Sequence, residues 1–529
     1  MQAISKEAIA EQAAAFIEQG TGLLGKGDYA GAARAFTRAI YLRPDIAELR
    51  YNLAQAYKKA GDLKAAALAL QQAIQIRPTF AMAHFELAGL YAKQRQYDLA
   101  ARHYQKLIEL SPDLATAYNN LATVLLEADQ PEKAIAYARK ALELSPDQPG
   151  PYLNLGVALT RCNRLDEALK VLQDAASRFQ DNADVLTNLG AVLHKLGRYE
   201  DALQAYQKAV STRPENVIAH FNLGLLLLVT GRFEQGWQEY GWRKRLDEIQ
   251  KELSRRGLGH PQWQGEDIAG KTILIHHEQG IGDTIQFVRY IPMVKAKGAR
   301  VLLEAQRPLL GLLKGLDGVD QLVPSGQAHQ FQCDIQASVM DLPGIFDTTI
   351  HTIPSNVPYI HPDRQAIQAW SQRLPDKRPR VGLVWAGAPR HKDDKNRSIR
   401  LDQIADLCRI EGICLVGLQK GPARAQLVNR PDLPIIDVSP QLTDWLQTAA
   451  VIANLDLVIS VDTAVLHLAG AMARPAWGLI SYVPDFRWLL DRDDSPWYPT
   501  VRLFRQGQDR DWAPVIARVA DELRGLVGR

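Results

Sequence analysis

Apolar and small residues recur along the first half of the chain with a step of 34 residues. One column holds six leucines, each followed by alanine or glycine, and a second column holds six alanines. Small residues let two antiparallel helices approach closely, and leucines fill the space between them. The pattern predicts helix pairs that stack into a right-handed solenoid over roughly residues 12–245. The two columns are Leu53, Leu87, Leu121, Leu155, Leu189 and Leu223, and Ala32, Ala66, Ala100, Ala134, Ala168 and Ala202.

Prolines and glycines mark the ends of the predicted helices with the same step. The prolines, which cannot continue a helix, are Pro44, Pro78, Pro112, Pro146 and Pro214. One cycle has Gln180 in place of proline, and Gly27, Gly61 and Gly197 fall where the chain turns between paired helices. In length and in the placement of its residues, the unit resembles the tetratricopeptide repeat, in about six and a half copies.

An asparagine column runs through the same repeats and is interrupted by Glu86. Its members are Asn52, Asn120, Asn154, Asn188 and Asn222. In the family that the repeats resemble, such a ladder on the concave face can clamp a peptide backbone through bidentate amide hydrogen bonds. The alternative is that asparagine is simply common at this position of the repeat. A solenoid exposes an extended concave surface that suits a binding role, so we expect a protein or peptide partner.

The pattern changes near residue 245. A charged stretch predicts a capping helix and linker over residues 246–264, and β-branched runs separated by helical segments follow. Runs at 272–275, 300–303, 321–323, 381–385, 413–418 and 457–461 predict strands, and 285–294 and 512–526 predict helices. We expect two Rossmann-like α/β halves, at 265–375 and 376–529, after an all-α solenoid at 1–245.

Three loops at predicted strand ends carry candidate chemistry, because open α/β sheets bind ligands at the carboxyl ends of their strands. The first holds Gly280, Gly282 and Asp283, although a simple helix cap would also explain this aspartate. The second, residues 385–398, is rich in cations that could hold phosphates, with a solvated loop as the alternative. The third, residues 460–467, opens a helix directly after a strand, which makes a ready anion site.

Four segments together resemble the glycosyltransferase family 9 (heptosyltransferase-like) domain over residues 262–528. They read EQGIGDTIQFVRY, VGLVWAGAPRHKDDKNRSI, LVISVDTAVLHLAGAMARP and DSPWYPTVRLFRQ. The resemblance implies a GT-B fold, in which two Rossmann-like domains face each other across a cleft and the C-terminal one holds the nucleotide sugar. It also implies transfer with inversion at the anomeric carbon, without a metal or any other cofactor.

The resemblance assigns roles to individual residues. Asp283 is implied as the general base, while Gln286 and Arg289 are placed to face the acceptor or the donor sugar, with helix-packing or surface roles as alternatives. The phosphate-binding cation falls near Arg397, with Lys395 and Lys392 as alternatives because the alignment there shifts by a residue or two. The implied donor-binding set is Arg397, Ser398, Lys395, Gln419, Lys420, Asp462, Thr463, Ala464 and His467, with Thr448 as a further candidate near the nucleobase.

The acceptor is expected to differ from that of the lipopolysaccharide heptosyltransferases, which lack a solenoid. The repeats suggest a polypeptide acceptor, and the architecture parallels the protein O-GlcNAc transferases, whose catalytic sequence is different. We therefore expect an inverting, metal-independent glycosyltransferase that modifies a protein held by the solenoid. Two alternatives stay open: a glycan or glycolipid acceptor with the solenoid recruiting a biosynthetic complex, and an inactive scaffold.

Composition adds few constraints. The 529 residues carry 62 basic and 59 acidic side chains, so the net charge of +3 gives no reason to bind nucleic acid or an anionic membrane. Four cysteines without a CxxC pair fit a reducing compartment, and the first residues lack the order of a secretory signal. The apolar run at 223–229 is far shorter than the ~20 residues of a membrane span. We expect a soluble, cytoplasmic protein with no metal site, and its oligomeric state stays open.

Overall fold

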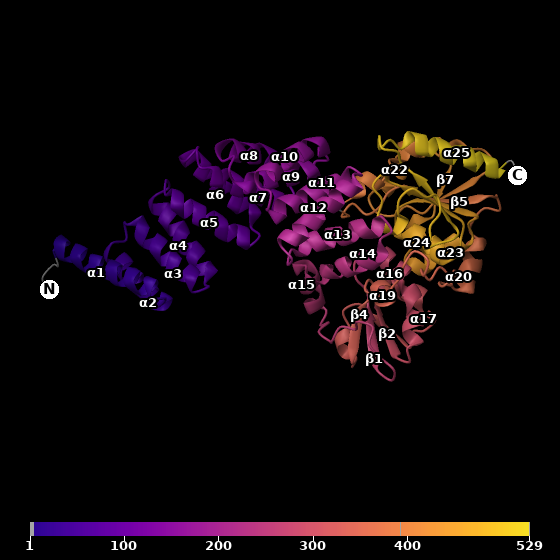
Figure 1. Ribbon diagram of the computed structural model, residues 1–529, viewed down its shortest axis with the longest axis horizontal. Coiled ribbons are helices and arrows are strands. Elements are labelled where there is room, and N and C mark those ends of the chain that lie inside the picture. The colour runs from indigo at the N-terminus through magenta and orange to yellow at the C-terminus, as the bar shows by residue number, and fades with distance from the viewer. Residues whose placement is uncertain (1–4, 392, 528–529) are drawn as a thin grey trace. The chain divides into compact units, whose positions relative to one another are not determined.

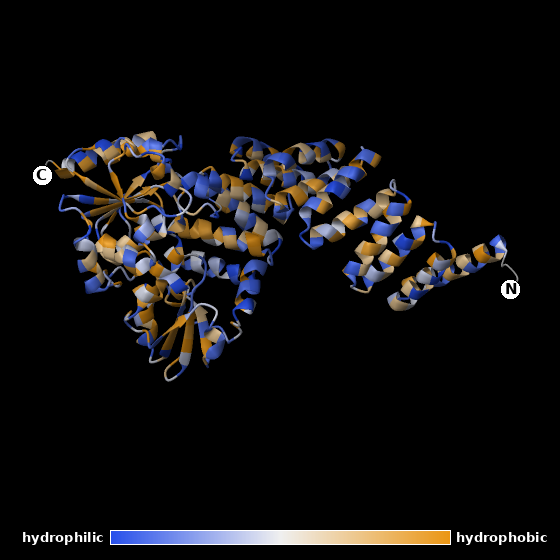
Figure 2. Cartoon of the chain, turned by 180° about the vertical axis from the view of Figure 1, so that it is seen from behind, coloured by the Kyte–Doolittle hydropathy of each residue, from blue (hydrophilic) through white to orange (hydrophobic). Residues whose placement is uncertain are grey.

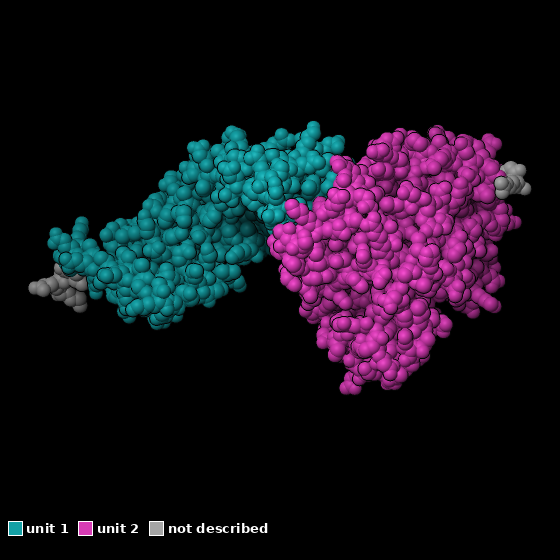
Figure 3. All heavy atoms as spheres, in the orientation of Figure 1, with its two compact units in different colours: residues 1–193 teal, residues 194–529 magenta. Residues whose placement is uncertain are grey.

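The computed structural model describes residues 5–391 and 393–527 (Figure 1). The chain forms two compact units, residues 1–193 and residues 194–529, which Figure 3 colours teal and magenta. Unit 1 consists of helices alone in its described part. Unit 2 holds the last helices of the repeat array and all strands of the described chain.

The repeat array is built from helices that pack as pairs. All six alanines of the predicted alanine column are fully buried, as close approach of the paired helices requires. The helices are α1 (Lys6–Gly25), α2 (Tyr29–Leu42), α3 (Ala47–Lys59), α4 (Leu63–Ile76), α5 (Ala81–Lys93), α6 (Tyr97–Leu110), α7 (Ala115–Glu127), α8 (Pro131–Leu144), α9 (Pro149–Arg161), α10 (Leu165–Arg178), α11 (Ala183–Lys195), α12 (Tyr199–Thr212), α13 (Val217–Val229) and α14 (Phe233–Tyr240). The pairs are α1 with α2, α3 with α4, α5 with α6, α7 with α8, α9 with α10, and α13 with α14.

The turn inside each helix pair uses the left-handed backbone conformation. Glycine supplies it in four repeats, where a positive φ carries no steric cost. In the other three repeats arginine, aspartate or asparagine adopts a φ between 55° and 59° at the same position. The seven residues are Gly27, Gly61, Arg95, Asp129, Asn163, Gly197 and Gly231. The repeat geometry therefore imposes this conformation even where the residue disfavours it.

The first α/β part is a parallel sheet with the strand order β3-β2-β1-β4. Ile273 in its central strand pairs with Val301 on one side and Ile335 on the other. The strands are β1 (Thr272–His276), β2 (Arg300–Ala305), β3 (Gln321–Pro324) and β4 (Ile335–Ser338), and the helices are α15 (Asp247–Arg255), α16 (Ile281–Phe287), α17 (Ile291–Lys295), α18 (Leu310–Leu313) and α19 (Leu342–Ile345). The single helix expected at 285–294 is instead α16 and α17 joined by the 3₁₀ turn Val288–Tyr290.

The second α/β part is a six-stranded parallel sheet with the order β10-β9-β8-β5-β6-β7. Helix α25 packs Val515, Ile516 and Val519 onto the same core as Val381 and Leu383 of β5. The strands are β5 (Arg380–Val384), β6 (Cys414–Gly417), β7 (Ile435–Asp437), β8 (Leu457–Val461), β9 (Ala476–Ile480) and β10 (Val501–Arg505), and the helices are α20 (Arg364–Ser371), α21 (Asp394–Arg397), α22 (Arg424–Val428), α23 (Trp445–Ala453), α24 (Ala464–Ala471) and α25 (Ala513–Val527).

The fold class follows from these elements. The strands of both sheets are mostly apolar, as expected for parallel sheets covered on both faces (Figure 2). The predicted combination of an all-helical repeat array with parallel α/β sheets of GT-B type is confirmed. The predicted domain limits at residues 245, 264 and 375 stay predictions. Among the described helices, none is both long and apolar enough to cross a bilayer.

The closest helix contact in the last repeat gives a test of this packing. A methyl group at Gly224 of α13 would lie 2.4 Å from the backbone nitrogen of Tyr240, so α13 and α14 would have to separate. Gly224→Ala is expected to lower the free energy of unfolding by about 1–3 kcal/mol in urea titrations. Gly525→Ala is the matched control, because its methyl would enter open space on α25. An equal loss in both variants would contradict the close packing.

Candidate active site

The two α/β parts meet at the amino ends of α16 and α24. These helices follow β1 and β8, the central strands of the two sheets, and pack against each other. Gly282 makes the approach close, since a Cβ there would lie 3.0 Å from the ring of His467 and 3.5 Å from Cα of Ala464. The predicted loop around Asp283 and the predicted loop around Asp462 and Thr463 are thus brought together at the carboxyl ends of their strands.

Asp283 lies in the first turn of α16 and is held by two donors. Its Oδ2 accepts a hydrogen bond from the backbone N–H of Gly280 at 2.6 Å. Its Oδ1 accepts a charge-assisted bond from Nη2 of Arg487, which belongs to the 3₁₀ turn Phe486–Trp488 after β9. The Asp283 side chain is 17% exposed and that of Arg487 is 6% exposed. Asp283 is thus not the N-cap itself, which is Gly280, but the N3 residue that bonds back to it through one oxygen and leaves the other oxygen to Arg487.

Arg487 makes further contacts that join the two α/β parts. Its Nε donates to the side-chain oxygen of Gln286 at 2.6 Å, and its Nη1 donates to Asp485 at 2.7 Å. The guanidinium also lies over the ring of Phe486, at 4.3 Å from the centroid. One cation thus bridges Asp283 and Gln286 of the first part and Asp485 of the second.

Burial controls the acidity of Asp283. Loss of solvent raises the pKa of Asp283 above its usual range, while the neighbouring Arg487 acts in the opposite direction. A carboxylate with a raised pKa is a stronger base than one in water. The arrangement can therefore accept a proton from a group that enters between the two parts.

Asp462 and His467 form a second titratable pair near this point. Burial, followed by the charge of Asp485, raises the pKa of Asp462 to about 6. Burial also lowers the pKa of His467 well below its usual range, so its ring is neutral at pH 7. The Nε2 atom of His467 lies 3.9 Å from Asp462, and its Nδ1 is 3.1 Å from the hydroxyl of Tyr498.

Thr463 and Ala464 open helix α24 as predicted. Thr463 is its N-cap in extended conformation, and its hydroxyl pairs with that of Ser460 at 2.9 Å. Both residues are half-buried. The first backbone N–H groups of α24 lie at the carboxyl end of β8, where an anion can be bound.

The loop after β5 closes on itself through Ser398. The hydroxyl of Ser398 accepts from the N–H of Gly387 and donates to Asp394, both at 2.9 Å. Arg397 lies 3.5 Å from Asp394, and its buried Nε has no hydrogen-bond partner among the described residues. Lys395 is exposed, and Lys392 lies outside the described residues. Arg397 is therefore the cation of this loop best placed to hold a buried anion.

The three predicted nucleobase contacts all have partners within the fold itself. The amide of Gln419 accepts from the N–H groups of Trp385 and Ala386 and donates to the carbonyl of Ala386. Lys420 donates to the carbonyl of Leu442, although its residue is exposed. The hydroxyl of Thr448 donates to its own helix at 3.0 Å. Gln419 thus secures the ends of β5 and β6.

Gln286 and Arg289 are both buried and sit one turn apart. Gln286 accepts from Arg487, while its Nε2 has no partner among the described residues. Arg289 donates to the carbonyl of Trp497 at 2.7 Å and to the hydroxyl of Tyr359 at 2.9 Å. For Arg289 the geometry favours the packing alternative, because its donors are already engaged.

The asparagine column lies on the first helix of successive pairs. Each of its members is half-buried. Asn154 donates to the side chain of Asn119 at 2.9 Å, Asn188 donates to the carbonyl of its own helix at 2.8 Å, and Glu86 pairs with Lys58 at 2.6 Å. The members are Asn52 (α3), Asn120 (α7), Asn154 (α9), Asn188 (α11) and Asn222 (α13).

Sequence reasoning missed the residue that organises the site. Arg487 and Asp485 follow β9, a strand that the sequence analysis did not predict. Their one signal was an Asp-x-Arg triplet after the apolar run Ala476–Ile480. Within the described chain, no group of three histidine, cysteine or acidic side chains is disposed to hold a metal ion.

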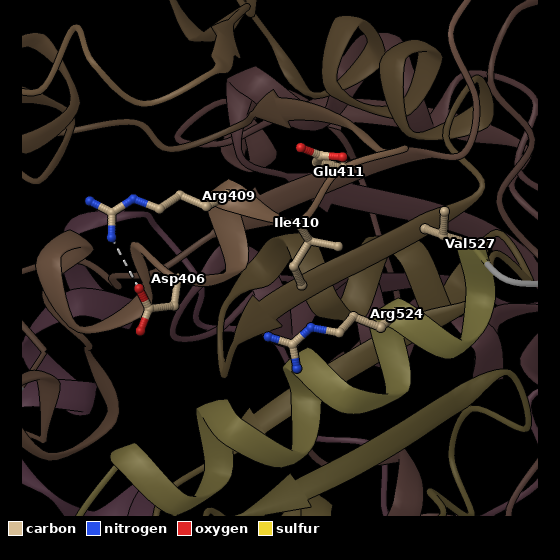
Figure 4. A pocket seen from close by; sticks show the side chains of 6 residues that line it. All are labelled: Asp406, Arg409, Ile410, Glu411, Arg524 and Val527. Carbon is tan, nitrogen blue, oxygen red and sulfur yellow. Dashed lines mark hydrogen bonds and ion pairs between the residues drawn. The ribbon is translucent and has the colours of Figure 1, made fainter.

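A surface hollow of about 600 Å³ lies elsewhere, beside the 3₁₀ turn Leu407–Arg409 and the last turn of α25 (Figure 4). Arg409 and Asp406 pair there at 3.2 Å. None of the predicted site residues lines this hollow. The candidate site is therefore defined by its side-chain contacts rather than by this cavity.

Comparison with known families agrees with this architecture. Residues 17–79, 79–147, 125–190 and 192–231 match profiles of the tetratricopeptide repeat. Residues 372–502 match glycosyltransferase family 9 (heptosyltransferase). The chain is thus a repeat protein that carries a glycosyltransferase family 9 domain at its C-terminal end.

The individual proteins that the chain resembles share about a quarter of its residues or fewer over the matched parts. The chain is 25% identical over 315 residues to protein FlbA of Caulobacter vibrioides, which covers 54% of this chain. It spans 52% of the length of that curated relative. Among solved structures, the chain resembles YrrB, described as a TPR protein with an unusual peptide-binding site. The two sequences are 26% identical, the match covers 36% of this chain and 97% of YrrB, and the TM-score is 0.32. A tetratricopeptide repeat protein from Parabacteroides merdae gives 16% identity, 46% and 97% coverage, and a TM-score of 0.40.

The raised pKa of Asp462 predicts a stability difference that depends on pH. The pKa of Asp462 in the fold lies above its unfolded value of about 3.9, so the fold favours the protonated carboxyl. The stability that this preference contributes is complete below about pH 4 and is lost as the pH rises through 6. Asp462→Asn removes the titration and is expected to be more stable than wild type by roughly 2–3 kcal/mol at pH 8. Urea unfolding at pH 4.5 should show little of this gain.

The control for this prediction is Asp494→Asn. Arg492 holds the pKa of the exposed Asp494 carboxyl below its usual range. Replacing Asp494 should therefore not increase the free energy of unfolding at pH 8. A pH-independent effect of Asp462→Asn would show that Asp462 is not a buried, protonatable group.

Proposed function

We propose that the chain is an inverting, metal-independent glycosyltransferase that uses a nucleotide-sugar donor, with Asp283 as general base. The observation that carries the proposal is the ion pair between Asp283 and Arg487 at the junction of the two parallel sheets. The Oδ1 atom of Asp283 lies 2.5 Å from Nη2 of Arg487, and both side chains are largely shielded from solvent. The match of residues 372–502 to glycosyltransferase family 9 supports the donor class.

The chemistry assigned to the site is a single displacement. Asp283 takes the proton of the acceptor as that group attacks the anomeric carbon, and the nucleoside diphosphate leaves from the opposite side. Arg487 orients the carboxylate, which keeps a lone pair on each oxygen beyond the bonds that it already accepts. The raised pKa of Asp283 suits it to accept the proton.

The leaving diphosphate gathers negative charge and needs donors that are already in place. The first N–H groups of α24, at Thr463 and Ala464, and the guanidinium of Arg397 are the groups proposed for this role. A guanidinium together with a helix amino terminus can stabilise this charge without a divalent ion.

The first test measures nucleoside diphosphate release from ADP-, UDP-, GDP- and dTDP-sugars, and nucleoside monophosphate release from CMP-sugars, with cell lysate as acceptor. One donor is expected to turn over, and Asp283→Asn should lower kcat by roughly 10²–10⁴-fold because the base is lost. EDTA should leave the rate unchanged. Asp317→Asn, at an exposed turn of the same α/β part, is the matched control.

Two outcomes would contradict the proposal. Equal turnover by wild type and Asp283→Asn would remove Asp283 as base, and loss of activity in EDTA would remove metal independence. Binding of neither a nucleotide sugar nor a nucleoside diphosphate would favour the inactive scaffold.

For the acceptor we propose a polypeptide held along the asparagine column. An amide side chain both donates and accepts, so it can pair with a peptide group in the same way at each repeat that carries asparagine. Asn52, Asn120 and Asn188 present such amides on half-buried positions of α3, α7 and α11. The repeats match a class whose extended surface suits a long, unfolded ligand.

The second test combines Asn120→Ala with Asn188→Ala. Each lost pair of amide hydrogen bonds is worth about 1 kcal/mol, so KM for a protein acceptor should rise roughly tenfold or more while the KM for the donor is unchanged. Gln72→Ala with Gln105→Ala, exposed amides on the second helices α4 and α6, is the matched control. Unchanged acceptor kinetics, or turnover with a purified glycan alone, would favour the glycan alternative.

A further inference from the structure

The last repeat packs directly on the elements that hold Asp283. Helix α13 and the 3₁₀ turn Phe486–Trp488 are in contact. The rings of Trp237 and Tyr240 of α14 each lie 5.8 Å from the ring of Phe486, the neighbour of Arg487. The indole N–H of Trp237 also donates to the carbonyl of Thr348 at 2.9 Å. The end of the repeat array is therefore one wall of the candidate site.

A buried ionic cluster connects the same repeat to the loop after β1. Arg243, in the 3₁₀ turn Gly241–Arg245, is 2% exposed. It donates to both oxygens of Glu278, at 2.8 and 3.0 Å, and to Asp341 at 2.7 Å. Lys244 adds a second cation, 3.5 Å from Asp341. Because one buried guanidinium bonds both oxygens of Glu278 and one oxygen of Asp341, Glu278 has little freedom to move.

A second contact fixes the next residue of the loop. Gln279 adopts a φ of 62°, the left-handed conformation that non-glycine residues rarely take. Its side-chain amide donates to the hydroxyl of Tyr240 at 2.9 Å. Glu278 and Gln279 directly precede Gly280, whose N–H binds Asp283. The repeat thus holds both residues that lead into the glycine turn.

The loop after β5, which carries Arg397, also contacts the repeats. Lys195, the last residue of α11, pairs with Asp393 at 2.8 Å, and its carbonyl accepts from Arg510. Both loops proposed for catalysis and donor binding therefore have contacts with residues 194–245.

We infer that Tyr240 and Arg243 are positioning residues of the transferase, which act through Gln279 and Glu278 to hold the glycine turn and Asp283 in place. The last repeat is then part of the active site rather than a separate binding module. The inference rests on the proposed function, in which Asp283 is the base.

The test uses Tyr240→Phe and Arg243→Gln in the full chain. Tyr206→Phe is the matched control, because Tyr206 is a buried tyrosine exactly 34 residues earlier, in the preceding repeat. Tyr240→Phe removes one hydrogen-bond acceptor and should lower kcat roughly five- to tenfold, with KM for the donor unchanged within twofold. Amide hydrogen exchange of residues 277–283 should become faster in both variants and stay unchanged in the control.

The exchange measurement separates this inference from the proposed function. If wild type turns over no donor, the proposed function fails, and the exchange rates of residues 277–283 still decide the positioning role. If Arg243→Gln does not fold, because two buried carboxylates lose their cation, Tyr240→Phe alone decides. A folded Tyr240→Phe with the kinetics and exchange of Tyr206→Phe overturns the inference.

Discussion

The guanidinium of Arg487 is the interaction on which the candidate site depends. It bonds Asp283 and Gln286 from one α/β part and Asp485 from the other, in surroundings that exclude most water. Removing one partner of such a buried pair costs about 3–5 kcal/mol, because the remaining charge is left uncompensated. The same contact gives Asp283 its orientation, so the junction of the two sheets and the proposed base are maintained by one side chain. Whatever binds between the sheets meets a carboxylate that is already in place.

The end of the repeat array, residues 195–245, belongs to this arrangement. Arg243 and Tyr240 reach the loop that precedes Asp283, and Lys195 reaches the loop after β5. A solenoid normally transmits packing from each repeat to the next, because each repeat contacts its neighbours. The last repeat thus adds to the contacts that hold the loop before Asp283. Between Tyr240 and β1 the chain forms the 3₁₀ turn Gly241–Arg245 and helix α15, and residues 256–271 then lead into β1.

The repeats could be predicted from the sequence because their packing repeats locally, and every alanine of the predicted column is buried. The loops at β1, β5 and β8 could also be placed, since each follows a clear apolar run. Arg487 could not be found, because it pairs with Asp283 across 204 positions of the chain and no local pattern encodes such a contact. Gln419 shows the opposite difficulty: a polar residue at a strand end suggested a ligand, yet its amide satisfies the backbone of β5. Composition likewise gave no sign that Arg289 would be enclosed by aromatic rings.

A double-mutant cycle on kcat/KM tests the central claim most directly, with Asp283→Asn, Arg487→Gln and the two combined. If Arg487 acts by holding Asp283, the losses are coupled, and the double variant should lie within about threefold of Asp283→Asn alone. The double variant leaves neither Asp283 nor Arg487 as an unpaired charge, although Asp485 loses its bond to Arg487. Losses that simply multiply would show that the two residues act independently, and the account of Arg487 as the support of the catalytic base would be wrong.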